Sequence, residues 1–157
     1  EFQTYIKNVL ANAKILAETL KNNGFKIYSG GTDTHLMLVD LRPFNVKGNL
    51  ASESLCRANI TCNKNGIPFD TEKPMVTSGI RLGSQAATTR GFGLKEFEKV
   101  GELITKVIKG LSENPEDNSK VEEEVRNEVV NLCSNFPIYK NLNKWFALYV
   151  KRVKPQL

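Results

Sequence analysis

Histidine, cysteine and long apolar runs are scarce in this sequence, and each shortage excludes a class of protein. The chain has one histidine and three cysteines, and Cys56, Cys62 and Cys133 lack the paired C-x-x-C spacing of zinc sites. No apolar run approaches the roughly 20 residues of a membrane-spanning helix, and the N-terminus has no signal-peptide pattern. We therefore expect no metal site, no association with a membrane and three reduced thiols in a cytoplasmic protein.

The charged residues are dispersed. There are 22 lysines and arginines against 17 aspartates and glutamates, which gives a net charge of +5, and no dense basic block is present. This pattern is not typical of nucleic-acid-binding proteins, so we expect no nucleic-acid partner. With 157 residues, 40% apolar and 25% charged, the chain has the composition of one globular domain. It begins with Glu1 rather than methionine, so we expect it to be part of a longer protein.

Apolar residues recur at three- and four-residue spacing in several segments, which indicates amphipathic helices. Gly24 is placed to end the first helix in a left-handed conformation, whereas Asn49 and Ser84 are candidate N-terminal caps of the second and third. The predicted helices cover residues 2–23, 47–58, 84–91, 95–110 and 119–134.

Strand-like runs lie between the first and second helices and before the third. Residues 25–29 and 35–41 are separated by the turn-rich GGTDT, which favours an antiparallel pair. Residues 59–77 are rich in proline, glycine and asparagine and are expected to form a loop after a brief strand, and 78–82 is expected to be a further strand. The predicted fold is therefore α+β, with helices packed on a small, mainly antiparallel sheet.

A lone arginine, Arg81, stands in the apolar run MVTSGIRLGS between two glycines. A guanidinium does not lose its proton in a protein, so it requires an anionic partner or several acceptors. Two interpretations stay open: an ion pair with Asp33, Asp40 or Asp70, or a site for a carboxylate or phosphate ligand, which the planar fork of Arg81 would suit. Asp70 is otherwise a typical turn residue, as is Asn65.

Three long stretches are specific enough to indicate a family: SGGTDTHLMLVDLR (29–42), RANITCNKNGIPFDTEKPMVTSGIRLGS (57–84) and TTRGF (88–92). NAKILAETL in the first predicted helix and LCSNFPIY (132–139) fit the same pattern. Together they closely resemble serine hydroxymethyltransferase. The resemblance implies that residues 1–139 are the small C-terminal domain of a pyridoxal-phosphate enzyme of the aspartate-aminotransferase-like fold, with an entering helix at 1–23.

The resemblance implies an activity and a set of site residues. The family interconverts serine and tetrahydrofolate with glycine and 5,10-methylenetetrahydrofolate, uses pyridoxal phosphate and forms dimers or tetramers. By the same resemblance, Arg81 would hold the carboxylate of the amino-acid substrate, and Asn65, Lys73, Pro74 and Met75 would contribute to the folate pocket.

The family's cofactor-binding lysine follows a TTTHK-like motif, and this motif is absent from the sequence. We therefore expect no catalytic residue and no pyridoxal-phosphate ligand in this chain, and we expect the chain by itself to be inactive. The alternative is a free-standing, non-catalytic domain that binds a carboxylate or phosphate ligand through Arg81.

Two segments depart from the family pattern. GSQA (83–86) stands where the family usually has Gly-Thr-Pro-Ala, so Gln85 replaces a helix-starting proline. Residues 140–157 form a basic and aromatic tail beyond the usual family end, and packing on a core or partner and binding at a membrane surface both stay open for it. Its apolar residues at helical spacing are Leu142, Trp145, Phe146, Tyr149, Val150 and Val153.

Overall fold

The computed structural model describes residues 1–139, and the tail singled out above, 140–157, lies outside the described residues. In chain order the elements are α1 (Phe2–Asn22), β1 (Lys26–Ile27), the 3-10 turn η1 (Tyr28–Gly30), β2 (Leu36–Asp40), the 3-10 turn η2 (Arg42–Phe44), α2 (Gly48–Arg57), β3 (Asn63–Asn65), β4 (Gly79–Gly83), α3 (Gln85–Arg90), α4 (Leu94–Glu113) and α5 (Ser119–Ser134). The predicted α+β class is confirmed.

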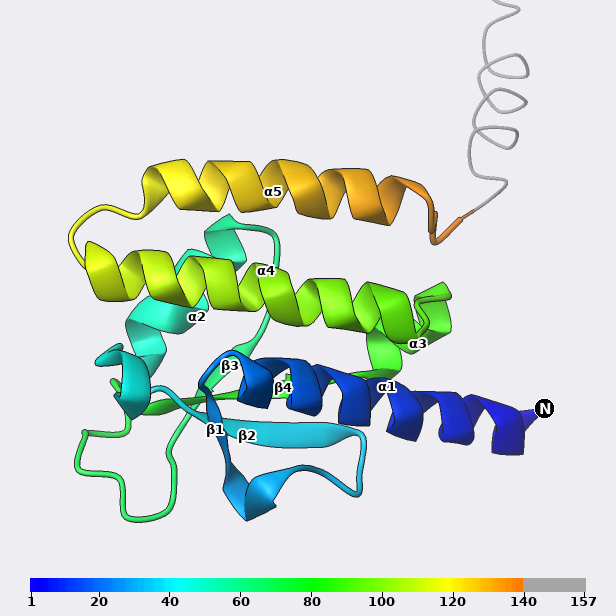
Figure 1. Cartoon of the computed structure of the whole chain (residues 1–157), viewed down its shortest axis with the longest axis horizontal. Helices are drawn as coiled ribbons and strands as arrows, with labels where there is room; N and C mark the ends of the chain where they lie inside the picture. Colours follow the sequence, from blue (N-terminus) through cyan, green and yellow to red (C-terminus); the bar gives the residue numbers. More distant parts are fainter. Residues whose placement is uncertain (140–157) are drawn as a thin grey trace, which may run out of the picture.

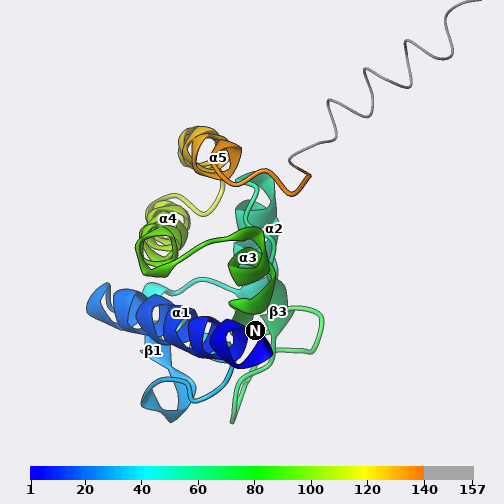
Figure 2. The same ribbon diagram turned by 90° about the vertical axis from the view of Figure 1, so that its right-hand side faces the viewer.

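Within residues 1–139 the strands form one four-stranded sheet in the order β1-β2-β4-β3, and every neighbouring pair is antiparallel. The helices are stacked on one face of this sheet. Helices α1 and α2 contact the strands, α4 lies across α1 and α2, and α5 lies outermost, as Figures 1 and 2 show. The opposite face, called the outer face below, carries no helix among the described residues.

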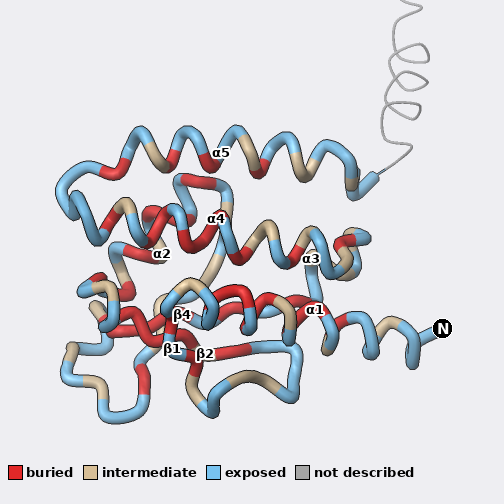
Figure 3. The backbone as a smooth tube through the Cα atoms, viewed as in Figure 1, coloured by how far each residue is buried: buried red, intermediate tan, exposed pale blue. Residues whose placement is uncertain are grey.

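The alternation of side chains along the two central strands explains this layering. In β2 and β4, Met37, Val39, Ile80 and Leu82 are buried toward the helices, whereas Arg81 between them is exposed. The buried positions of the tube in Figure 3 gather accordingly between the sheet and α4. The larger helix side chains that complete this core are Leu16, Leu20, Leu55, Phe97, Leu103, Ile104 and Ile108.

The predicted helices are all present, and α4 extends three residues beyond its predicted end. The chain turns after α1 at Gly24, which has a φ of +93°, as predicted. The predicted strand 25–29 is shorter than expected, because β1 ends at Ile27 and the chain then turns into η1.

The predicted cap at Asn49 is wrong, whereas Ser84 occupies the predicted N-cap position of α3 but makes no capping hydrogen bond with its side chain. Helix α2 begins at Gly48, so Asn49 lies inside its first turn, and the amides of Gly48 and Asn49 donate to the carbonyls of Thr77 and Val76 at 2.9 Å. Ser84 does precede α3, but its hydroxyl donates to the carbonyl of Val9 at 2.7 Å. In both cases a backbone segment distant in sequence provides contacts that a local motif does not encode.

None of the helices within residues 1–139 is both long and apolar enough to cross a lipid bilayer.

Candidate functional site

Arg81 lies in the middle of β4, and its backbone is held from both sides. It pairs with Leu38 of β2 and with Asn63 of β3. Its neighbours Ile80 and Leu82 point into the core, so its own side chain is directed to the outer face, where it is exposed. Arg81 thus stands in an apolar run of the sequence, but its side chain is exposed rather than buried.

Among residues 1–139, Arg81 forms no ion pair and no side-chain hydrogen bond. Two of its three candidate partners are engaged elsewhere. The carboxylate of Asp40 accepts hydrogen bonds from Nε and Nη2 of Arg42 at 3.0 and 2.7 Å, and the carboxylate of Asp70 is bound within its own loop. The interpretation of Arg81 as a structural ion-pair partner is not supported in the described part of the chain.

Asp40 shows how a carboxylate is held beside the candidate site. Its side chain is almost fully buried, which on its own would raise its pKa, but the side chain and amide of Arg42 donate to it and Lys26 lies 4.0 Å away. The pKa of Asp40 is consequently below its usual value. Asp40 is ionised at neutral pH and neutralised by Arg42, so it does not compete for Arg81.

Gly79, two residues before Arg81, has a packing role. A Cβ at Gly79 would lie 2.5 Å from Cγ2 of Ile67 and 2.7 Å from the carbonyl oxygen of Val39. Ile67 is buried although it comes from the segment between β3 and β4. Residues 66–78, called the β3–β4 loop below, therefore fold over the outer face next to Arg81, and Gly79 makes this close approach possible.

The residues expected to line the folate pocket lie at the end of β3 and in the β3–β4 loop. Asn65 pairs with Gly79, and its side-chain amide donates to the carbonyl of Gly66 at 2.7 Å. Lys73, Pro74 and Met75 are exposed, and 74% of the Met75 surface is accessible. The sheet thus places Asn65 and Arg81 in one ladder, while Lys73–Met75 lie in the loop that returns to β4.

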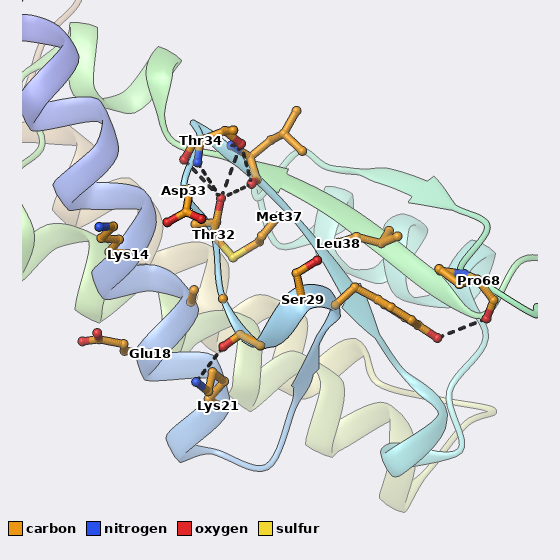
Figure 4. A pocket seen from close by; sticks show the side chains of 15 residues that line it. Lys14, Glu18, Lys21, Ser29, Thr32, Asp33, Thr34, Met37, Leu38 and Pro68 are labelled. Atoms are coloured by element: carbon orange, nitrogen blue, oxygen red, sulfur yellow. Dashed lines mark hydrogen bonds between the residues drawn. The ribbon is translucent and has the colours of Figure 1, made fainter.

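A groove of about 780 Å³ lies beside residues 36–38 of β2, which do not pair with β1, and between α1 and residues 28–34 (Figure 4). Hydrogen bonds order its wall: Thr32 Oγ1 donates to the carbonyl of Leu36 at 2.6 Å, and the hydroxyl of Tyr28 donates to the carbonyl of Pro68 at 3.2 Å. Leu38, which lines the groove, is the β2 residue paired with Arg81. The groove therefore adjoins the Arg81 position.

The sequence-predicted site residues do not themselves line this groove. Arg81, Asn65 and the residues 73–75 are absent from its lining. Thr32 and Asp33 belong to it, although Thr32 was not singled out and Asp33 was considered only as an ion-pair partner of Arg81. The available signal was the stretch SGGTDTH, whose two glycines and small polar residues predict a turn but not a groove.

Comparison with known proteins agrees with the resemblance. The family model for serine hydroxymethyltransferase matches residues 1–104. The serine hydroxymethyltransferase of Pelagibacter ubique (strain HTCC1062) is 87% identical over 142 residues, which are 90% of this chain and 33% of that protein. Those of Marinomonas sp. (strain MWYL1) and Paramagnetospirillum magneticum (strain ATCC 700264 / AMB-1) are 65% and 61% identical over 140 residues, which are 89% of this chain and 33% of each relative.

The chain thus spans about a third of the length of the curated relatives it matches. The family model nevertheless covers well over half of the chain. It includes β4 with Arg81, the two strands that pair with it, β2 and β3, and the whole β3–β4 loop. The chain therefore belongs to the serine hydroxymethyltransferase family.

Proposed function

We propose that this chain is part of a cytoplasmic, dimeric or tetrameric enzyme that interconverts serine and tetrahydrofolate with glycine and 5,10-methylenetetrahydrofolate. Residues 1–139 are its C-terminal domain, with the entering helix at 1–23. Arg81 binds the carboxylate of the amino-acid substrate, and Asn65, Lys73, Pro74 and Met75 contribute to the folate pocket.

The observation that carries this proposal is the unneutralised guanidinium of Arg81 on the outer face. Its backbone is held in two strand pairings, and no acid among residues 1–139 pairs with it. A planar guanidinium fork forms two parallel, charge-assisted hydrogen bonds with a carboxylate, whereas a lysine offers only a point charge. In this role Arg81 neutralises the carboxylate of serine or glycine and sets the orientation of its α-carbon.

The described residues do not by themselves fit the cofactor of the family. Pyridoxal phosphate supplies the electron-withdrawing ring that makes bond cleavage beside the amino group of serine possible. A lysine that captures such an aldehyde is activated in a desolvated pocket, and none of the lysines within residues 1–139 is buried. We therefore assign the cofactor to the part of the enzyme outside this chain and derive no step from it.

A hybrid enzyme tests the proposal. In it, the matching third of the Pelagibacter ubique relative is replaced by this chain, and serine cleavage is measured with tetrahydrofolate. We expect activity and an absorbance band from bound pyridoxal phosphate. A hybrid enzyme that folds and binds the cofactor but does not use serine would contradict the proposal and favour a non-catalytic binding domain.

Substitutions at Arg81 test its assigned role in the same hybrid enzyme. Arg81→Lys should lower kcat/KM for serine by roughly 30-fold to several-thousand-fold, because a charge-assisted pair in a closed site is lost. Cofactor absorbance and thermal midpoint should be unchanged. Arg126→Lys, at an exposed arginine of α5 whose Nε donates to the carbonyl of Arg57, is the matched control and should leave the kinetics unchanged. A collapsed midpoint in both Arg81→Lys and Arg81→Ala would identify Arg81 as a structural residue instead.

A further inference from the structure

The β3–β4 loop has a conformation that needs specific support. Near its two ends, Phe69 and Thr77 have φ values of +59° and +61°, in the left-handed region that side chains other than glycine rarely adopt. Phe69 is 96% exposed, so apolar packing of its side chain does not compensate for this conformation. Other contacts must therefore hold the loop that carries Lys73, Pro74 and Met75.

The side chain of Asp70 provides these contacts. Its Oδ2 accepts hydrogen bonds from the amides of Ile67 at 3.2 Å and Ser78 at 2.9 Å, and its Oδ1 accepts from the amide of Glu72 at 2.9 Å and the hydroxyl of Ser78 at 2.7 Å. One carboxylate thus joins the first part of the loop to Ser78, the residue directly before β4. Both oxygens act only as acceptors, so the ionised form is required for the full set.

The groups around Asp70 favour this ionised form. Although burial opposes it, the hydrogen bonds from Glu72, Ser78 and Ile67 keep the pKa of Asp70 well below its usual value. The far side of the loop is fixed separately, because Lys47 pairs with Glu72 and the first amides of α2 donate to the carbonyls of residues 76 and 77. Asp70 therefore links the part of the loop at Glu72, which Lys47 holds, to Ser78, which follows the two residues that α2 holds.

We propose that Asp70 is a positioning residue, which holds the β3–β4 loop in one conformation and thereby places Lys73, Pro74 and Met75 against the folate co-substrate. The assignment of those residues to folate rests on the proposed function. Arg81 is held independently by its pairing with Leu38 and Asn63. Asp70 consequently acts on the folate side of the site and leaves the carboxylate side in place.

Asp70→Asn in the hybrid enzyme tests this assignment. One carboxylate oxygen becomes an NH₂ group, which faces the donors of the loop and leaves them without an acceptor. We expect amide hydrogen exchange in peptides covering residues 66–78 to become about tenfold faster, while peptides of α1 and α4 are unchanged. The KM for tetrahydrofolate should rise about tenfold, and the KM for serine should stay within about twofold.

Two variants control the experiment. Ser78→Ala removes one of the four donors and should shift both readouts in the same direction by a smaller factor. Asp117→Asn changes another aspartate that accepts from a backbone amide, that of Ser119 at 3.0 Å before α5, and should leave both readouts unchanged.

The two measurements separate the possible failures. Three outcomes would overturn the role of Asp70. The first is unchanged amide exchange in the loop, and the second is faster loop exchange with an unchanged KM for tetrahydrofolate. The third is a parallel rise of both KM values with faster exchange throughout the protein. If the unsubstituted hybrid enzyme does not use serine, the proposed function fails. In that case the exchange measurement still decides whether Asp70 holds the loop.

Discussion

A charged cluster on the helical side of the sheet and Arg81 on the outer face differ in whether the domain supplies the counter-charge. On the helical side, the buried carboxylate of Glu122 accepts from Arg57 Nε and Nη2 at 2.6 and 2.7 Å and from Ser54 Oγ at 2.6 Å, so α5 is joined to α2. On the outer face, Arg81 has no such partner within residues 1–139. A charge that the domain itself neutralises is part of its structure, whereas one that it holds in place without neutralising is available to an external anion.

The polar contacts on the helical side form a closed network. Asn118 donates to Ser54 Oγ at 3.1 Å and to the carbonyl of Val107 at 3.0 Å, so the same cluster also reaches α4. The pKa of Glu122 is lowered chiefly by the hydrogen bond from Arg57, against the effect of burial. In this structural cluster the buried carboxylate of Glu122 has its hydrogen bonds and its counter-charge within the domain.

The largest expected effect contrasts two phenylalanines from the two sides. Phe97 of α4 is 2% exposed and packs edge-on against Phe92, whereas Phe69 of the β3–β4 loop is 96% exposed. Phe97→Ala should lower the free energy of unfolding of the chain by about 3–5 kcal/mol, because it removes buried surface and leaves a cavity. Phe69→Ala should change it by less than about 0.5 kcal/mol. Urea denaturation of both variants measures the difference, and equal effects would refute the contrast.

A smaller effect contrasts two arginines. Arg57→Ala leaves the carboxylate of Glu122, which is 4% exposed, without its counter-charge, and should cost about 2–4 kcal/mol of unfolding free energy. Arg81→Ala breaks no ion pair among the described residues. The thermal midpoint of this variant should therefore stay within about 2 °C of that of the unsubstituted chain. Calorimetry on both variants is the measurement. A large loss for Arg81→Ala would mean that Arg81 stabilises the fold.

The arginine comparison has a pH dependence that sharpens it. The pKa of Glu122 is lower in the folded chain than in the unfolded chain. The contribution of Glu122 to stability is therefore complete when the pH is above its pKa in the unfolded chain, and it is lost as the pH falls through its pKa in the folded chain. The destabilisation by Arg57→Ala should therefore shrink as pH falls below about 4.5. Denaturation curves at pH 7 and pH 3 would show it, and a pH-independent difference would exclude the charge as the cause.

The smallest expected effect belongs to an exposed acid on the same helix as Glu122. Glu128 pairs with Lys99 at 2.8 Å and with Lys106 at 3.2 Å, but its side chain is 37% exposed. Glu128→Gln should cost less than about 0.5 kcal/mol, since solvent screens both pairs. A loss comparable to that of Arg57→Ala would show that burial is not what separates the two clusters.

Local patterns were sufficient for the helices and for most of the sheet. The three- and four-residue spacing predicted the long helices within residues 1–139, and 78–82 was correctly expected to be a strand, but that Ile80 and Leu82 face the core while Arg81 faces outward came from the structure. The resemblance added the family, which the comparisons confirm. These features depend on periodicity or on long motifs, both of which are properties of contiguous sequence.

What the tertiary structure decided concerns partners that are distant in sequence. Asn49 and Ser84 fit a local capping rule, yet their hydrogen bonds run to carbonyls of other segments: the amide of Asn49 donates to Val76 and the hydroxyl of Ser84 to Val9. Asp70 has the composition signature of a turn residue, but only the folded loop shows that it joins Ile67 to Ser78. The sequence offered three aspartates as ion-pair partners of Arg81. In the fold, the carboxylate of Asp40 is bound by Arg42 and that of Asp70 by donors of its own loop. Hydrogen bonding and ion pairing depend on distances of a few ångströms, and the sequence by itself specifies such distances only between near neighbours in the chain.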